Sequence, residues 1–422
     1  MSRVYKLLSD ELVRHTAIMF FGMMVVHVSN LAFQMLVSRR LPDVEYALLA
    51  AFLAFLGILS YPLLTLTTGL GHYCSLLRRE QRAGDIRRLV FKWLVLTGVP
   101  ALFICSAVIY FNQPIAAFMH LDRAAPVIIA GAVLPALFWF PVLSGAAQGL
   151  EMFGWNTASA IFGAFLKFAL GAGLVWFWYP ACGWAMMGHS AGVYLSVAVL
   201  LLGLFLALRH VGSSAAQLPS LRLYLGQSLF VQIAFAVLMN ADVILVKHFL
   251  PADTNFPYAS TLGRIVAFMP MAIAFAMFPK VSSSGAFNEE HRRIFLRSFA
   301  YTTLCVAAAA LFCLIFPALM LRILFGIREA GPELIYLSRL MTIAMASCAM
   351  LNTTIQFLLA QRHFRGLAVT ILSAVLYILA ARAYHHDSAD IALAAIGFNT
   401  LALLSSLISA LGIKPSNAVT PR

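Results

Sequence analysis

Charge is scarce in this sequence. Charged residues make up 11% of the 422 residues and hydrophobic residues 62%, whereas soluble domains carry about 25% charged residues. A soluble core of this size has no use for so much apolar surface. The composition therefore excludes an ordinary soluble domain and predicts an integral membrane protein.

Recognisable catalytic and metal-binding motifs are also missing. The chain contains no HExxH, no GxSxG, no P-loop and no Cys/His cluster at metal spacing, and its six cysteines never form CxxC. The cysteines fall mostly in or beside apolar runs, which favours small buried apolar residues over disulfides or zinc ligands. Isolated histidines are expected to be structural: His189 as an interior residue, and His385 and His386 in a solvated turn. We expect no enzyme activity, no metal and no cofactor.

The charge that is present is mostly positive. The formal net charge is +13, and most of it lies between the apolar runs, so we expect contact with anionic lipid head groups rather than with nucleic acid. Counting Lys and Arg in alternate connections gives 19 on one side and 8 on the other, with Lys167 and Arg264 inside apolar runs. The positive-inside rule then predicts that both termini are cytoplasmic.

The apolar runs predict an all-α protein with about 12 transmembrane helices, each about 20 residues long. We expect two six-helix bundles, 1–208 and 226–411, joined by a polar cytoplasmic linker at 209–225 and followed by a polar tail at 412–422. The N-terminus is predicted to be a first anchor rather than a cleavable signal. The predicted spans are 15–38, 44–71, 89–112, 124–148, 155–178 and 185–208, then 226–250, 257–279, 298–320, 333–358, 366–383 and 388–411.

Landmarks recur between the two halves. The corner Leu41-Pro42 before Tyr46 resembles the corner Leu250-Pro251 before Tyr258, and the two prolines are 209 residues apart. Three further pairs keep offsets of 208 to 211 residues: Pro62 with Pro270, Gln148 with Gln356, and Phe153 with Phe364. Six spans per half give the halves the same orientation, so we expect a pseudo-two-fold axis along the membrane normal and a substrate site between the bundles.

Three charges lie within predicted spans. Lys167 is near the midplane of its span with no acidic residue within two turns of its helix, so it either snorkels to a carbonyl or lines a cavity that accepts an anion. Asp242 and Arg264 have similar depths and are predicted to pair. That pair has either a structural role or a role in gating and substrate binding.

Several polar residues extend this candidate cavity. His27, Asn30 and Gln34 share one helical stripe, which faces either neighbouring helices or a water-filled lumen. Asn240 occupies a position in the second half comparable to Asn30. Arg39 and Arg40 follow the stripe at the outer end of the first span.

The repeated corners and the turn from Gln148 to Trp155 resemble the multidrug/oligosaccharidyl-lipid/polysaccharide (MOP) exporter superfamily, and most closely its Wzx-type O-antigen and capsule flippases. The residues concerned are Ala241–Pro251, Tyr258–Arg264 and Phe278–Val281. The resemblance implies two six-helix bundles around a cavity that opens alternately to each side, a polyprenyl-diphosphate-linked oligosaccharide as substrate, and in some members coupling to a proton or sodium gradient. Lipid II flippases typically carry two further spans, which this chain lacks.

The expected function is therefore flipping of a lipid-linked oligosaccharide in polysaccharide or lipopolysaccharide biosynthesis at the bacterial inner membrane. Polysaccharide polymerase or glycosyltransferases are candidate partners, alongside membrane lipids. One alternative is a cation-coupled multidrug exporter of the same fold, which would need carboxylates in its cavity; here the runs offer Asp242 inside and Glu45 near an end. Another is a membrane-bound transferase or assembly scaffold.

Overall fold

The computed structural model describes residues 11–121, 123–209, 222–268 and 289–413, with isolated positions between 270 and 281. Regular secondary structure in those ranges is entirely helical, and packing divides the chain into two compact units. The N-terminal unit is Met1–Leu49 with Leu63–Leu225, and the C-terminal unit is Ala50–Pro62 with Gly226–Arg422. The N-terminal unit lacks Ala50–Pro62 and extends to Leu225, whereas the predicted bundle is 1–208.

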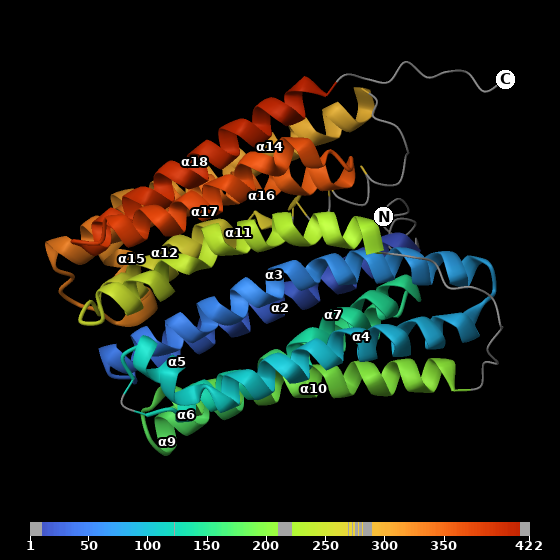
Figure 1. The fold of residues 1–422 in the computed structure, drawn as a ribbon, viewed down its shortest axis with the longest axis horizontal. Helices are drawn as coiled ribbons and strands as arrows, with labels where there is room; N and C mark the ends of the chain where they lie inside the picture. The colour runs from blue at the N-terminus through green and yellow to red at the C-terminus, as the bar shows by residue number, and fades with distance from the viewer. Residues whose placement is uncertain are drawn as a thin grey trace, which may run out of the picture. The chain divides into compact units, whose positions relative to one another are not determined.

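The N-terminal part of the chain contains helices of very different lengths (Figure 1). They are α2 (Glu11–Ser38), α3 (Asp43–Arg79), α4 (Ala83–Tyr110), α5 (Asn112–Phe118), α6 (Ala125–Ala132), α7 (Leu134–Gly149), α8 (Phe153–Leu166), the π-helix η1 (Lys167–Ala172), α9 (Gly173–Phe177) and α10 (Cys182–Leu208). Helix α3 contributes to both units: its segment Ala50–Pro62 belongs to the C-terminal unit, and the rest belongs to the N-terminal unit. Pro62 is the last residue of that segment. A proline at this position removes one i→i−4 hydrogen bond of the helix.

The C-terminal part is also built of long helices joined by shorter helical segments. Its helices are α11 (Arg222–Phe249), α12 (Phe256–Phe268), α14 (Glu289–Ile315), α15 (Pro317–Phe325), α16 (Pro332–Ala360), the 3₁₀ turn η2 (Phe364–Leu367), α17 (Ala368–Ala383) and α18 (Ser388–Gly412). Figure 1 draws α14, α16, α17 and α18 as neighbouring lengthwise helices, in agreement with their packing contacts. Helix α16 is buried along most of its length, and Phe357 on it stacks on Phe295 of α14 at 4.3 Å between ring centroids.

Ten helices in the described ranges are long and apolar enough to cross a membrane, so the chain is a multi-pass membrane protein. Of the other two predicted spans, 15–38 coincides with α2, whose side chains are described mainly from Met24 onward, and 257–279 begins as α12. Most of the remainder of 257–279, most of the segment Phe278–Val281, most of the linker 209–225, and the tail beyond 413 lie outside the described residues.

The core of the N-terminal unit lies between α3, α4, α7 and α10. Its fully buried members are apolar and come from all four helices: Leu70 and Cys74, Ile86 and Leu89, Val142 and Leu143, and Leu200. All six cysteines are free thiols, and four of them are buried. No group of three His, Cys, Asp or Glu that could hold a metal ion is found among the described residues.

The duplicated turn after Gln148 has the same backbone in both halves. Glu151 and Arg362 each have a positive φ, 59° and 54°, and each is flanked by the two hydrogen bonds of a Schellman helix end. These residues are 211 positions apart, the same offset as Phe153 and Phe364 two residues later. The two turns therefore share one backbone conformation, which Gln81 and His120 also adopt at other helix ends.

Candidate functional site

Lys167 lies where α8 changes into a π-helix. The six residues of η1 (Lys167–Ala172) adopt π geometry, which is rare and often found at functional sites. The Lys167 side chain is half-buried and donates from Nζ to Oδ1 of Asn30 at 3.0 Å, and Nζ lies 4.6 Å from the centre of the Phe33 ring. Both partners are on α2. The lysine therefore joins two helices of the N-terminal unit through an amide and an aromatic face, not through a carboxylate.

Close helix packing fixes the backbone around Lys167. Gly163, Lys167 and Gly171 are spaced by four residues along α8 and η1, and they face Gly188 and Gly192 of α10. A Cβ on Gly192 would lie 2.4 Å from the Gly163 carbonyl oxygen and 3.0 Å from the Lys167 Cβ. Small residues at four-residue spacing allow membrane helices to approach this closely.

The polar stripe predicted on the first span is only partly used. Asn30 contacts Lys167, whereas His27 is exposed. Oε1 of Gln34 and Nδ1 of His189 are buried without a hydrogen-bond partner among the described residues. The contact of the stripe with Lys167 is therefore made by Asn30.

The remaining predicted cavity residues have other environments. Arg39 and Arg40 follow the end of α2, and both are exposed. Asn240, the counterpart of Asn30 in the second half, is buried and donates to the Ala236 carbonyl of its own helix at 3.0 Å. Their positions along the spans predicted that these residues line the same cavity as Lys167. The hydrogen bond of Asn240, however, is made within its own helix α11.

The predicted pair of Asp242 and Arg264 is present in the C-terminal unit. Asp242 on α11 is fully buried and accepts from Nη2 of Arg264 at 2.7 Å through Oδ1. Its Oδ2 accepts from the Ser260 hydroxyl. Ser260 and Arg264 are one turn apart on α12, so both reach the same carboxylate. The buried carboxylate is therefore fully engaged, and the pair carries no net charge.

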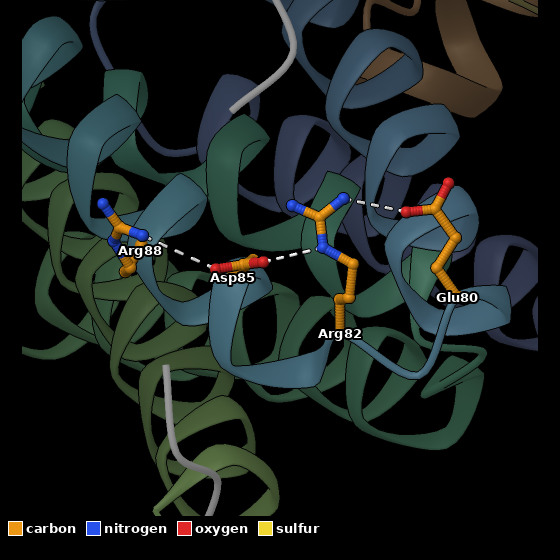
Figure 2. Close-up of polar contacts among 4 residues, drawn as sticks. All are labelled: Glu80, Arg82, Asp85 and Arg88. Carbon is orange, nitrogen blue, oxygen red and sulfur yellow. Dashed lines mark hydrogen bonds and ion pairs between the residues drawn. The ribbon is translucent and has the colours of Figure 1, made fainter. Parts of the chain in front are cut away.

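Other acidic groups near the spans are also engaged. Glu45 accepts from the backbone N–H of Cys182 at 2.6 Å and so caps the first turn of α10. Asp85 is fully buried at the start of α4 and binds Arg82 at 2.8 Å and Arg88 at 3.6 Å, as Figure 2 shows. The carboxylate of Glu80, followed by that of Asp85, holds the pKa of the Arg82 guanidinium above its ordinary value.

Lys167 and Asp242 differ in their ionic contacts. Lys167 has no carboxylate partner among the described residues, while Asp242 is matched by Arg264. A charge near the bilayer centre costs at least about 2.5–3.5 kcal/mol, so Lys167 either reaches the polar surface by snorkelling or requires a polar partner.

Solved structures with the same fold are multidrug and related transporters. An inward-facing multidrug-resistance MATE family transporter of the MOP superfamily superposes with a TM-score of 0.69 at 15% identity, over 94% of this chain and 96% of that one. The chain has the fold of the MOP superfamily transporters. An outward-facing MATE transporter gives 0.69 at 16% identity, with 94% of each chain covered.

A third MOP superfamily transporter, from Pyrococcus furiosus, gives a TM-score of 0.69 at 14% identity and 94% coverage of each chain. It is described as having a binding pocket of reverse polarity that suggests a different function. No protein-family model and no curated protein matches the sequence. At these identities the MOP likeness establishes the fold, and the substrate has to be inferred from the site itself.

Proposed function

We propose that this MOP-fold protein is a membrane transporter that flips an anionic lipid-linked oligosaccharide, a polyprenyl diphosphate carrying a saccharide, by alternating access. The observation that carries the proposal is Lys167, a half-buried cation whose described contacts are an amide and an aromatic ring. A diphosphate is the complementary ligand, because an ammonium group forms strong charge-assisted hydrogen bonds with phosphate oxygens. The polyprenyl tail of such a substrate can remain in the lipid.

The state of the carboxylates supports the same choice. A cationic substrate needs an open carboxylate in the transporter interior, yet Asp242 is held by Arg264 and Ser260, and Glu45 caps α10. Binding a cation at Asp242 would require breaking a buried ion pair, which costs about 3–5 kcal/mol. An anion at Lys167 requires only the exchange of a neutral hydrogen bond.

The second candidate is a multidrug exporter of the same fold. It is favoured by the structural neighbours, two of which are described as multidrug-resistance MATE transporters. The Pyrococcus furiosus protein is described as having a pocket of reverse polarity that suggests a different function, so the shared fold does not by itself select this candidate. For either candidate, we propose that transport is coupled to a proton or sodium gradient. We also propose that the protein lies in the bacterial inner membrane with both termini in the cytoplasm.

The deciding experiment compares Lys167 variants in proteoliposomes. A fluorescent polyprenyl-diphosphate oligosaccharide is added to one leaflet, and the fraction protected from a membrane-impermeant quencher is followed over time. We expect Lys167→Ala to slow flipping at least about tenfold, because losing a charged hydrogen-bond donor in a buried site costs roughly 1.5–3 kcal/mol. Lys167→Arg keeps the charge and is expected to retain most of the activity.

Arg382 supplies the matched control, since it is a cation on α17 that is exposed. Arg382→Ala is expected to flip lipid at the rate of the unmodified protein. Equal flipping by Lys167→Ala and Arg382→Ala would refute the role of Lys167. Export of an ethidium-like cation by the same vesicles, without flipping of the diphosphate lipid, would favour the multidrug candidate.

A further inference from the structure

A second duplicated sequence lies at the start of the third helix of each half. The first copy reads Asp85-Ile-Arg-Arg-Leu-Val-Phe-Lys92, and the second reads Glu290-His-Arg-Arg-Ile-Phe-Leu-Arg297. The two copies are 205 residues apart and share an acidic residue, an Arg-Arg pair, three apolar residues, and Lys or Arg in the same order. We call this shared pattern the Arg-Arg motif. Its offset of 205 residues is close to the 208 to 211 of the other repeated landmarks.

Both copies present the same residues to the surroundings. In α4 the exposed members are the Arg-Arg pair, Phe91 and Lys92, and in α14 they are the Arg-Arg pair, Leu296 and Arg297. Phe91 is 69% exposed and Leu296 is 44% exposed. The positions between them face the interior in each unit, as Val90 and Phe295 illustrate. Both copies therefore expose a combination of cations and one large apolar side chain.

An apolar stripe continues from the motif along each helix. On α4 the exposed side chains include Val95, Val99 and Phe103, spaced by four residues from Phe91, and Phe103 is 75% exposed. On α14 they include Leu304 at 69% and Leu311 at 59%. Side chains at such spacing lie on one helical face, so each helix offers a lipid-facing surface that begins with basic residues.

Several cations of this surface lack an acidic partner within the described part of the chain. Asp85 takes Arg82 and Arg88, as Figure 2 shows, and the exposed Arg87 and Lys92 have no ionic partner among the described residues. The same holds in the second copy for Arg292, Arg293 and Arg297, again counting described residues alone. Each copy therefore keeps at least two open cations next to an exposed apolar stripe.

We infer that each Arg-Arg motif binds the phosphate of an anionic phospholipid, with the acyl chains lying along the apolar stripe of α4 or α14. Basic groups just outside the bilayer core attract anionic head groups, each contributing about fivefold in affinity. The chain makes six predicted crossings between the two motifs, spans three to eight, so both motifs are expected on the same side of the membrane. This binding does not depend on which substrate the transporter moves.

Native mass spectrometry of the full-length protein in detergent, titrated with phosphatidylglycerol or phosphatidylcholine, tests the inference. We expect two phosphatidylglycerol molecules to bind at least tenfold more tightly than phosphatidylcholine. Arg87→Gln with Lys92→Gln is expected to weaken one of the two sites about 30-fold, from two lost contributions. Adding Arg292→Gln and Arg297→Gln should remove the second site.

Exposed cations elsewhere provide the control: Arg322→Gln with Arg382→Gln is expected to leave both sites intact. Conservative Arg87→Lys should retain binding, which separates loss of charge from loss of fold. Equal affinity for the two phospholipids, or unchanged binding by the fourfold variant, would overturn the inference. Displacement of phosphatidylglycerol by an equal concentration of a polyprenyl diphosphate would also overturn it, by identifying the motifs as substrate sites.

Discussion

The contact between η1 and α10 makes a sharp prediction at Gly188. A Cβ on this residue would lie 2.2 Å from the Cα and 2.3 Å from the backbone nitrogen of Gly171. Carbon atoms in van der Waals contact lie about 3.5–4.0 Å apart, so the two backbones must separate by more than about 1 Å to admit the methyl group. Backbone atoms cannot rotate away as a side chain can, and the displacement must involve the whole helical segment.

Gly188→Ala is therefore expected to destabilise the N-terminal unit by about 1–3 kcal/mol, the usual cost of overpacking. That loss corresponds to a fall of about 2–6 °C in unfolding temperature. The displaced segment includes Lys167, whose carbonyl oxygen would lie 3.1 Å from the new Cβ. We accordingly expect slower flipping as well as lower stability.

Gly173 is the matched control, because it follows η1 directly and a methyl group added there would have no described heavy atom within 4 Å outside its own helix. Gly173→Ala should raise stability by up to about 1 kcal/mol through helix propensity alone. Thermal unfolding of the two variants in detergent, followed by circular dichroism, measures the contrast. Shifts of the same sign and size would refute the argument that the η1–α10 contact needs glycine.

Two further predictions concern the engaged carboxylates, with stability again read from unfolding in detergent. Asp242→Asn and Arg264→Met should each lower the free energy of unfolding by about 3–5 kcal/mol, because each leaves a buried charge without its partner. The double variant should lose clearly less than the sum of the two. Strictly additive losses would contradict an interaction between the two residues. Glu45→Leu should lower the free energy of unfolding by about 0.5–2 kcal/mol, because it removes a helix cap. Cys182→Ala keeps the backbone N–H that Glu45 binds and should therefore lose less stability. Equal losses would contradict the role of Glu45 as a cap.

The positions of the membrane helices could be predicted because apolar length is a local property of the sequence. The tenth predicted span, 333–358, is α16 (Pro332–Ala360), and the twelfth, 388–411, is α18 (Ser388–Gly412). Predicted starts were late where a helix begins with charged turns: α14 begins at Glu289, although its span was predicted from 298. The short helices α5 and α15 were missed because neither is long enough to give an apolar run of its own.

Of the contacts at the candidate site, the sequence predicted the ion pair between Asp242 and Arg264 but not the hydrogen bond between Lys167 and Asn30. Two opposite charges at equal depth must meet in an apolar medium, which is why Asp242 and Arg264 could be paired from spacing alone. The contact between Lys167 and Asn30 depends on how α2 and η1 pack, and 137 residues separate the two. The π-helix at Lys167 and the Ser260 hydroxyl on Asp242 likewise arise from tertiary packing, which a single sequence does not specify.

The two halves agree where they face the membrane and differ inside. The Arg-Arg motif and the turns at Glu151 and Arg362 recur with the same exposure or backbone in both. The ionic contacts inside the units differ. Lys167 has no carboxylate partner among the described residues, whereas Asp242 in the other unit is paired with Arg264. The proposed diphosphate ligand would place its charge at Lys167, and Lys167→Ala tests that placement directly.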